Sequence, residues 1–104
     1  MDILTKENFQ STIDNATEPV VVDFYANWCM PCKLITPVLE ELSVQYQGKV
    51  RFYKVDIDKS PELAAPFQIM SIPCVLCFHN GQLHDRRVGA VPKEEFVGMF
   101  AGLL

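Results

Sequence analysis

The chain has 104 residues, of which 49% are hydrophobic and 21% charged, with a formal net charge of −4 at pH 7. This length and composition predict one globular domain, residues 1–104, which is large enough to bury a core without disulfide or metal staples. The acidic balance and the lack of a basic cluster argue against nucleic acid or an anionic membrane as the partner, and no apolar stretch approaches the roughly 20 residues of a membrane span.

The first half of the chain predicts a helix, a buried strand and a longer helix. Residues 6–14 carry apolar side chains at helical spacing, and Thr5 is the expected N-cap. Residues 20–26 are almost continuously hydrophobic, which predicts a strand buried on both faces. A helix follows over residues 29–46, and Pro37 inside it removes a backbone hydrogen bond, so we expect a kink there.

The second half predicts a hairpin and two further helices. Three more strands are expected, at residues 50–56, 73–78 and 82–88. Asn80-Gly81 joins the last two and is the strongest short hairpin signal. A short helix is expected over residues 60–67, and Pro92 opens a terminal helix at its first position. Because helices interleave with strands and the last two strands form a hairpin, the predicted fold class is α/β, with a central mixed β-sheet flanked by helices on both faces.

The segment Trp28-Cys29-Met30-Pro31-Cys32 lies where the buried strand passes into the long helix. A Cys at a helix N-terminus meets unpaired backbone N–H groups and the positive end of the helix dipole, which favour the nucleophilic thiolate. Cys32 lies within one helical turn of Cys29. The spacing therefore predicts a redox site in which Cys29 attacks a foreign disulfide and Cys32 resolves the mixed disulfide.

Asp23 is a further candidate, because a carboxylate within Val20–Phe24 should be buried with a raised pKa. Placed behind the cysteines, it would accept the proton of Cys32 during resolution. The alternative is a structural Asp that is hydrogen-bonded to loops. Trp28 also has two interpretations, as a packing residue or as the rim of a substrate surface, and the rim is favoured because this residue abuts Cys29.

The cysteine count leaves a competing hypothesis open. The chain begins without the basic-then-apolar order of a signal peptide, so we expect a cytoplasmic protein, in which four cysteines indicate catalysis or metal binding. Cys74 and Cys77 form a second Cys-x-x-Cys pair, which allows a structural zinc site. In a strand, however, these two side chains point to opposite faces, roughly 10 Å apart at about 3.3 Å per residue. A redox-inactive binding module is the third hypothesis, although both cysteines of the first pair are present.

From end to end the chain resembles thioredoxin. The matching motifs are Val22-Asp23-Phe24-Tyr25-Ala26, Trp28-Cys29-x-Pro31-Cys32-Lys33, Pro37, Lys54, Asp58, Ile72-Pro73, Asn80-Gly81 and Val88-Gly89. The resemblance implies a cytosolic protein-disulfide reductase that acts on disulfide-containing protein substrates. It also implies that thioredoxin reductase, an NADPH-linked flavoprotein, restores the dithiol. We expect a monomer that needs no cofactor or metal of its own.

The resemblance also assigns site residues. It implies a cis Ile72–Pro73 bond beside the cysteines, where a proline offers no N–H and leaves the Ile72 backbone free to pair with an extended substrate. Lys54, on the strand adjacent to Asp23, would keep that carboxyl from remaining permanently protonated. The implied catalytic residues are Cys29, Cys32, Asp23, Lys54 and Pro73, and the implied substrate surface is Trp28, Met30, Pro31, Ile72 and Gly89.

Three positions depart from the family pattern. Met30 replaces the usual Gly between the cysteines, Tyr25 replaces a frequent Trp, and Cys74 stands where a Thr usually follows the proline. Met30 adds an apolar, oxidisable side chain beside the thiolate. We therefore expect the fold to be kept, and these departures leave the redox potential and the substrate range open.

Overall fold

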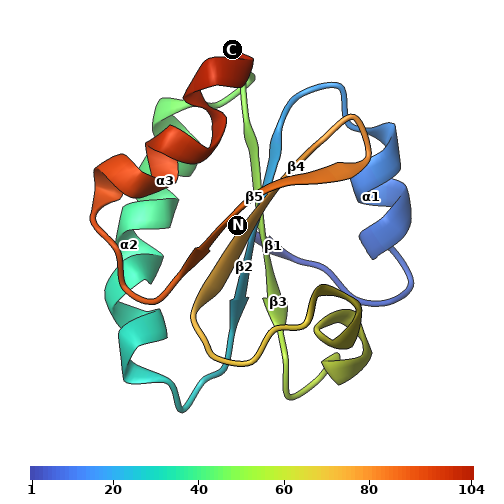
Figure 1. Ribbon diagram of the computed structural model, residues 1–104, viewed down its shortest axis with the longest axis vertical. Helices are drawn as coiled ribbons and strands as arrows, with labels where there is room; N and C mark the ends of the chain where they lie inside the picture. Colours follow the sequence, from blue (N-terminus) through green and yellow to red (C-terminus); the bar gives the residue numbers. More distant parts are fainter.

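A five-stranded mixed sheet forms the centre of the computed structural model, which describes residues 1–104 (Figure 1). The strands are β1 (Asp2–Ile3), β2 (Val20–Tyr25), β3 (Arg51–Asp56), β4 (Cys74–His79) and β5 (Gln82–Val88), in the spatial order β1-β3-β2-β4-β5. The first three neighbours run parallel, whereas β4 is antiparallel to β2 and β5 is antiparallel to β4. The predicted mixed sheet is confirmed, and the two-residue edge strand β1 was not predicted.

Helices cover both faces of this sheet. The α-helices are α1 (Phe9–Asn15), α2 (Met30–Gln45) and α3 (Lys93–Phe100), and short 3₁₀ helices occupy Pro61–Leu63, Ala65–Phe67 and Ala101–Leu103. In Figure 1, α2 and α3 lie on one side of the sheet, and α1 lies on the other side with the 3₁₀ segment before β4. None of these helices combines the length and the hydropathy that a membrane crossing requires.

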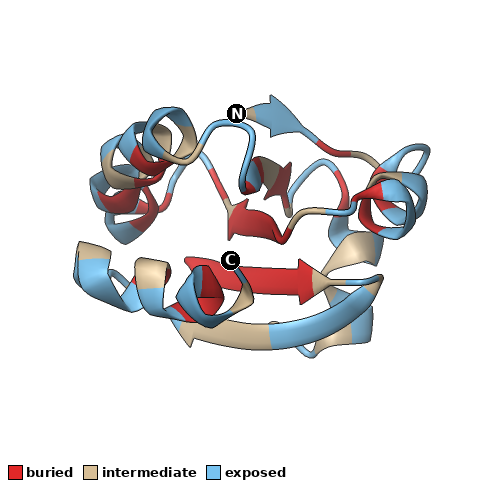
Figure 2. Ribbon diagram, turned by 90° about the horizontal axis from the view of Figure 1, so that it is seen from above, coloured by how far each residue is buried: buried red, intermediate tan, exposed pale blue.

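The sheet separates two apolar cores, which explains why β2 reads as continuously hydrophobic. Val20, Val22 and Phe24 pack on the α1 side, whereas Val21 packs with residues of α2 and α3 on the other. Every residue of β2 except Tyr25 is buried, and Figure 2 shows buried strands between exposed helix surfaces. Because side chains alternate between the two faces along β2, Asp23 lies with Val21 on the face that α2 covers.

The helix starts differ from the predictions in two places. Helix α1 begins at Phe9 and Asn8 holds its N-cap position, so the prediction of Thr5 as the cap was wrong. Thr5 instead forms a turn with Asn8, whose Oδ1 accepts a 2.8 Å hydrogen bond from the Thr5 N–H. Pro92 precedes the first helical residue of α3, because its ψ of 157° is extended rather than helical.

The predicted short helix over residues 60–67 is a pair of 3₁₀ turns. Pro61 and Pro66 both lack a backbone N–H, which removes donors from any α-helical ladder through this segment. The second turn ends at Gln68, in the left-handed region with φ 53°. The hairpin prediction is confirmed, since Asn80 and Gly81 have φ values of 55° and 79°, as a two-residue primed turn requires.

Candidate active site

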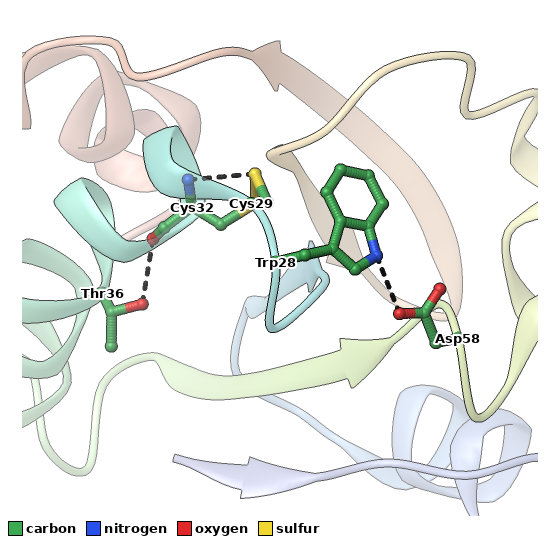
Figure 3. The surroundings of a disulfide bond; sticks show 5 residues. All are labelled: Trp28, Cys29, Cys32, Thr36 and Asp58. Atoms are coloured by element: carbon green, nitrogen blue, oxygen red, sulfur yellow. Dashed lines mark hydrogen bonds between the residues drawn. A yellow bond between two sulfur atoms is a disulfide. The ribbon is translucent and has the colours of Figure 1, made fainter.

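Helix α2 begins at the cysteine pair. Cys29 is its N-cap residue, Cys32 lies in its first turn, and the two form a disulfide with their Cα atoms 5.3 Å apart (Figure 3). The Cys32 N–H donates a 3.2 Å hydrogen bond to Cys29 Sγ. A sulfur thus takes the place of the Ser or Asp oxygen that commonly satisfies a first-turn N–H. Because Cys29 directly precedes the helix, the N–H group of Cys32 in the first turn points toward the sulfur of Cys29.

Pro37 interrupts the backbone ladder of α2 one turn beyond this pair. Its missing N–H leaves the helix without one bond, and the neighbouring Thr36 hydroxyl donates to the Cys32 carbonyl at 3.0 Å (Figure 3). The first turn of α2 is therefore fastened by a side chain as well as by backbone bonds.

Trp28 extends the site onto the molecular surface. Its side chain is 68% exposed, and its indole Nε1–H donates a 2.9 Å hydrogen bond to Asp58 Oδ2 (Figure 3). Asp58 is itself placed by a turn in which its N–H donates to Asp56 Oδ1 at 2.9 Å. Trp28 therefore presents an exposed ring in a fixed orientation next to Cys29.

The loop before β4 forms the opposite side of the site. The Ile72–Pro73 bond is cis, as the resemblance implied, and Ile72 packs against the cluster that contains both cysteines. The Gly89 N–H donates to the Pro73 carbonyl at 2.8 Å, and Gly89 has a φ of +90°, which a glycine adopts readily. The structure thus brings Ile72, Pro73 and Gly89 together beside the cysteine pair.

A hollow of about 300 Å³ lies between Trp28 and the Ile72 loop. Its lining is mostly hydrophobic and consists of Trp28, Ile57, Ala64, Ile69, Met70, Ser71 and Ile72. Met70 is 93% exposed and is the most exposed large hydrophobic residue of the chain. Met70 was not among the predicted site residues, because an apolar residue in an irregular loop gives no specific signal in the sequence.

Asp23 lies in β2 and is 1% exposed, as predicted. Its Oδ1 has no hydrogen-bond partner, so the alternative of a carboxylate satisfied by loop groups does not hold for this atom. Burial raises the pKa of Asp23 to about 7, and the positive charge of Lys54 opposes the rise. Lys54 lies beside it because Asp23 and Lys54 are register partners in β2 and β3.

Comparison with known proteins places this geometry in context. The sequence profile of the family described as Thioredoxin matches residues 1–101. Thioredoxin C-2 of Corynebacterium nephridii is 47% identical over 91 residues, which cover 88% of this chain and 84% of that protein. A thioredoxin of Staphylococcus aureus is 45% identical over 91 residues, covering 88% of this chain and 86% of the relative.

The chain belongs to the thioredoxin family. It is a thiol-disulfide oxidoreductase, and Cys29 and Cys32 are its redox-active pair.

The second cysteine pair is a different kind of feature. Cys74 and Cys77 are free and buried, and they belong to different cores on opposite faces of β4, as the strand geometry predicted. Burial raises the pKa of Cys77 to about 12 and also raises that of Cys74, so both thiols stay protonated at neutral pH. Side chains on opposite faces do not chelate one ion, and the redox activity is assigned to the first pair.

Met30 and Pro31 lie between the active cysteines of this thioredoxin-family chain, and both are exposed. Met30 is the first residue of α2, and 65% of its surface is accessible. With Trp28 and Met70 it adds apolar surface around the buried sulfurs.

Proposed function

We propose that this protein reduces disulfide bonds in other proteins and that thioredoxin reductase, an NADPH-linked flavoprotein, restores its dithiol. The observation that carries the proposal is the Cys29–Cys32 pair at the start of α2, with a backbone N–H on Cys29 Sγ. The names of the two thioredoxin relatives support it. We further propose that the protein works in the cytoplasm as a single-domain monomer.

Cys29 is the attacking thiol in this proposal. Its thiolate attacks one sulfur of the substrate disulfide, a mixed disulfide forms, and the other substrate sulfur leaves as a thiolate. Asp23 then accepts the thiol proton of Cys32, whose sulfur attacks Cys29 Sγ and releases the second substrate thiolate. The product is the Cys29–Cys32 disulfide, and the substrate has gained the two electrons.

The proposed substrate surface surrounds the two sulfurs. It consists of Trp28, Met30, Pro31, Ile72 and Gly89, and the hollow adds Ile69 and Met70. An extended substrate segment is expected to pair with the backbone of Ile72, which precedes the buried Pro73. Lys54 acts through Asp23 and touches no substrate.

Brief alkylation of the reduced protein at neutral pH should modify Cys29 first. The Cys32 N–H and the dipole of α2 favour its thiolate, whereas Cys74 and Cys77 are buried thiols with raised pKa values. Peptide mapping after a short exposure to iodoacetamide measures the order. Earlier labelling of Cys32, Cys74 or Cys77 would contradict the assignment of the nucleophile.

Replacing Met30 with glycine should weaken the reduction of protein disulfides and leave the reduction of a small disulfide reagent almost unchanged. Burying about 40 Å² of apolar surface at about 25 cal/mol per Å² contributes roughly 1 kcal/mol, which is a factor of about five in affinity. Because the Met30 side chain is itself exposed, it covers little of the nearby sulfur, so the effect on the thiolate is expected to be small. KM for insulin and the rate with a small aromatic disulfide measure the two effects.

Val44→Gly is the matched control for this variant, because Val44 is an exposed apolar residue of the same helix near its far end. It should leave both rates unchanged. Equal losses on both substrates in Met30→Gly would show that Met30 acts through the redox properties of the cysteine pair. In a Met70→Leu background, peroxide treatment followed by full re-reduction of the thiols should reproduce the Met30→Gly defect, since a sulfoxide is polar.

A further inference from the structure

Tyr25 is one of the positions at which the chain departs from the family pattern, and the ammonium group of a lysine lies over its ring. The Nζ of Lys54 lies over this ring, 5.3 Å from its centroid. That distance is within the range in which an ammonium group is attracted to the negative face of an aromatic ring. Tyr25 is the last residue of β2 and packs against the cluster that contains Cys29 and Cys32.

The same lysine supplies the positive charge that opposes the rise in the pKa of Asp23. The two residues are register partners, yet they form no ion pair within 4.0 Å, and Asp23 Oδ1 has no hydrogen-bond partner. Lys54 therefore acts on Asp23 through space, and the strength of this action depends on where its ammonium group is held. In the structure, this ammonium group lies against the ring of Tyr25, two residues beyond Asp23 along β2.

We propose that the ring of Tyr25 fixes the ammonium group of Lys54 near Asp23, which makes Tyr25 a positioning residue for the proton transfer assigned to that carboxyl. Without the ring, the flexible lysine chain extends into water, where its charge is better solvated and acts less on Asp23. The rise in the Asp23 pKa that burial causes is then less well opposed, so Asp23 holds its proton to higher pH. The catalytic consequence rests on the proposed function, but the electrostatic one does not.

Other ionisable groups around Asp23 leave this inference intact. Cys74 on β4 senses the Asp23 charge, but burial keeps its thiol protonated over the relevant range. Cys77 on the same strand has a pKa raised to about 12. On α2, Cys29 and Cys32 do not titrate as a disulfide. Asp56 on β3 lies opposite Tyr25 in register, and its Oδ1 is engaged by the N–H groups of Asp58 and Lys59.

The test is the titration midpoint of the Asp23 carboxyl in the oxidised protein, followed by carbon NMR. Lys54→Met, which removes the charge, should raise the midpoint by about one pH unit. Tyr25→Leu should raise it by at least half of that shift, whereas Tyr25→Phe, which loses the hydroxyl but keeps the ring, should leave it unchanged. Tyr25→Met is a second variant without a ring, in case the leucine variant does not fold.

A double-variant cycle separates the lysine from other effects of the ring. Tyr25→Leu in the Lys54→Met background should cause no further shift, because the cation is already absent. A persisting shift would overturn the proposal by showing that the ring acts through hydration of Asp23. A lowered midpoint in Tyr25→Leu would also overturn it, since it would mean that the ring keeps Lys54 away from Asp23. Because no step of catalysis is measured, failure here leaves the proposed reductase function standing.

Discussion

A Cys32→Ser variant should stop after the first half of the reaction and accumulate mixed disulfides between Cys29 and its substrates. Cys32 lies in the first turn of α2, within bonding reach of Cys29 Sγ, so it acts as an intramolecular attacker with a high effective concentration. External thiols at about 1 mM do not match this concentration, and multiple-turnover reduction of insulin should fall by about a hundredfold or more.

Gel electrophoresis without reductant measures the trapped species as bands of increased mass that vanish with dithiothreitol. Cys29→Ser is the control and should give no such bands, because the attacking sulfur is missing. Cys74 and Cys77 are buried on opposite faces of β4, so neither is expected to replace Cys32. Rapid turnover by Cys32→Ser that disappears in the Cys32→Ser/Cys74→Ser double variant would refute this and identify Cys74 as a resolving thiol.

An Asp23→Asn variant should be more stable than the wild type above pH 7 and slower in disulfide reduction. The wild-type carboxyl has a pKa of about 7 in the folded state, against an ordinary value of 3.8, because it is buried. At about 1.4 kcal/mol per pKa unit, charging it in the folded state costs on the order of 4 kcal/mol of the free energy of unfolding, although burial of an amide offsets part of the gain in the variant. Removing a general base is expected to slow resolution by about tenfold or more.

The pH dependence distinguishes this explanation from a general stabilisation. Below pH 4 both the folded and the unfolded wild type hold the Asp23 proton, and no charge is buried. Between about pH 4 and 7 the unfolded state releases this proton while the folded state keeps it, so wild-type stability falls as the pH rises. Above about 7 the loss is complete. Urea unfolding of both proteins from pH 4 to 9 measures the difference, and parallel profiles with equal turnover would return Asp23 to a structural role.

Features that depend on neighbouring residues in the chain were predicted well. The strand from Val20, the helix after Cys29 and the Asn80-Gly81 hairpin each follow from local periodicity or turn chemistry, and the structure confirms them. The burial of Asp23 also followed from its position within an apolar strand.

Three features that depend on distant residues were not predicted. Strand β1 is too short to show a pattern and exists because Asp2 and Ile3 pair with β3. The hollow combines Trp28 with Met70, which lies far away in the sequence, and neither residue alone indicates a cavity. The stacking of Lys54 on Tyr25 likewise requires the register of two strands that α2 separates.

The two edges of the sheet differ from its apolar centre. Edge strand β1 has only two residues, and edge strand β5 carries Asp85, Arg86 and Arg87, with Arg87 bound to Asp85 and to Glu95 of α3. Short or charged edges discourage a further chain from adding to the sheet and starting an aggregate. Under the proposed function, the protein is expected to meet extended substrate segments repeatedly. The charged side chains of β5 and the brevity of β1 disfavour strand addition at the sheet edges, which leaves the short loop at Ile72 as the place where the proposed function expects a substrate segment to pair.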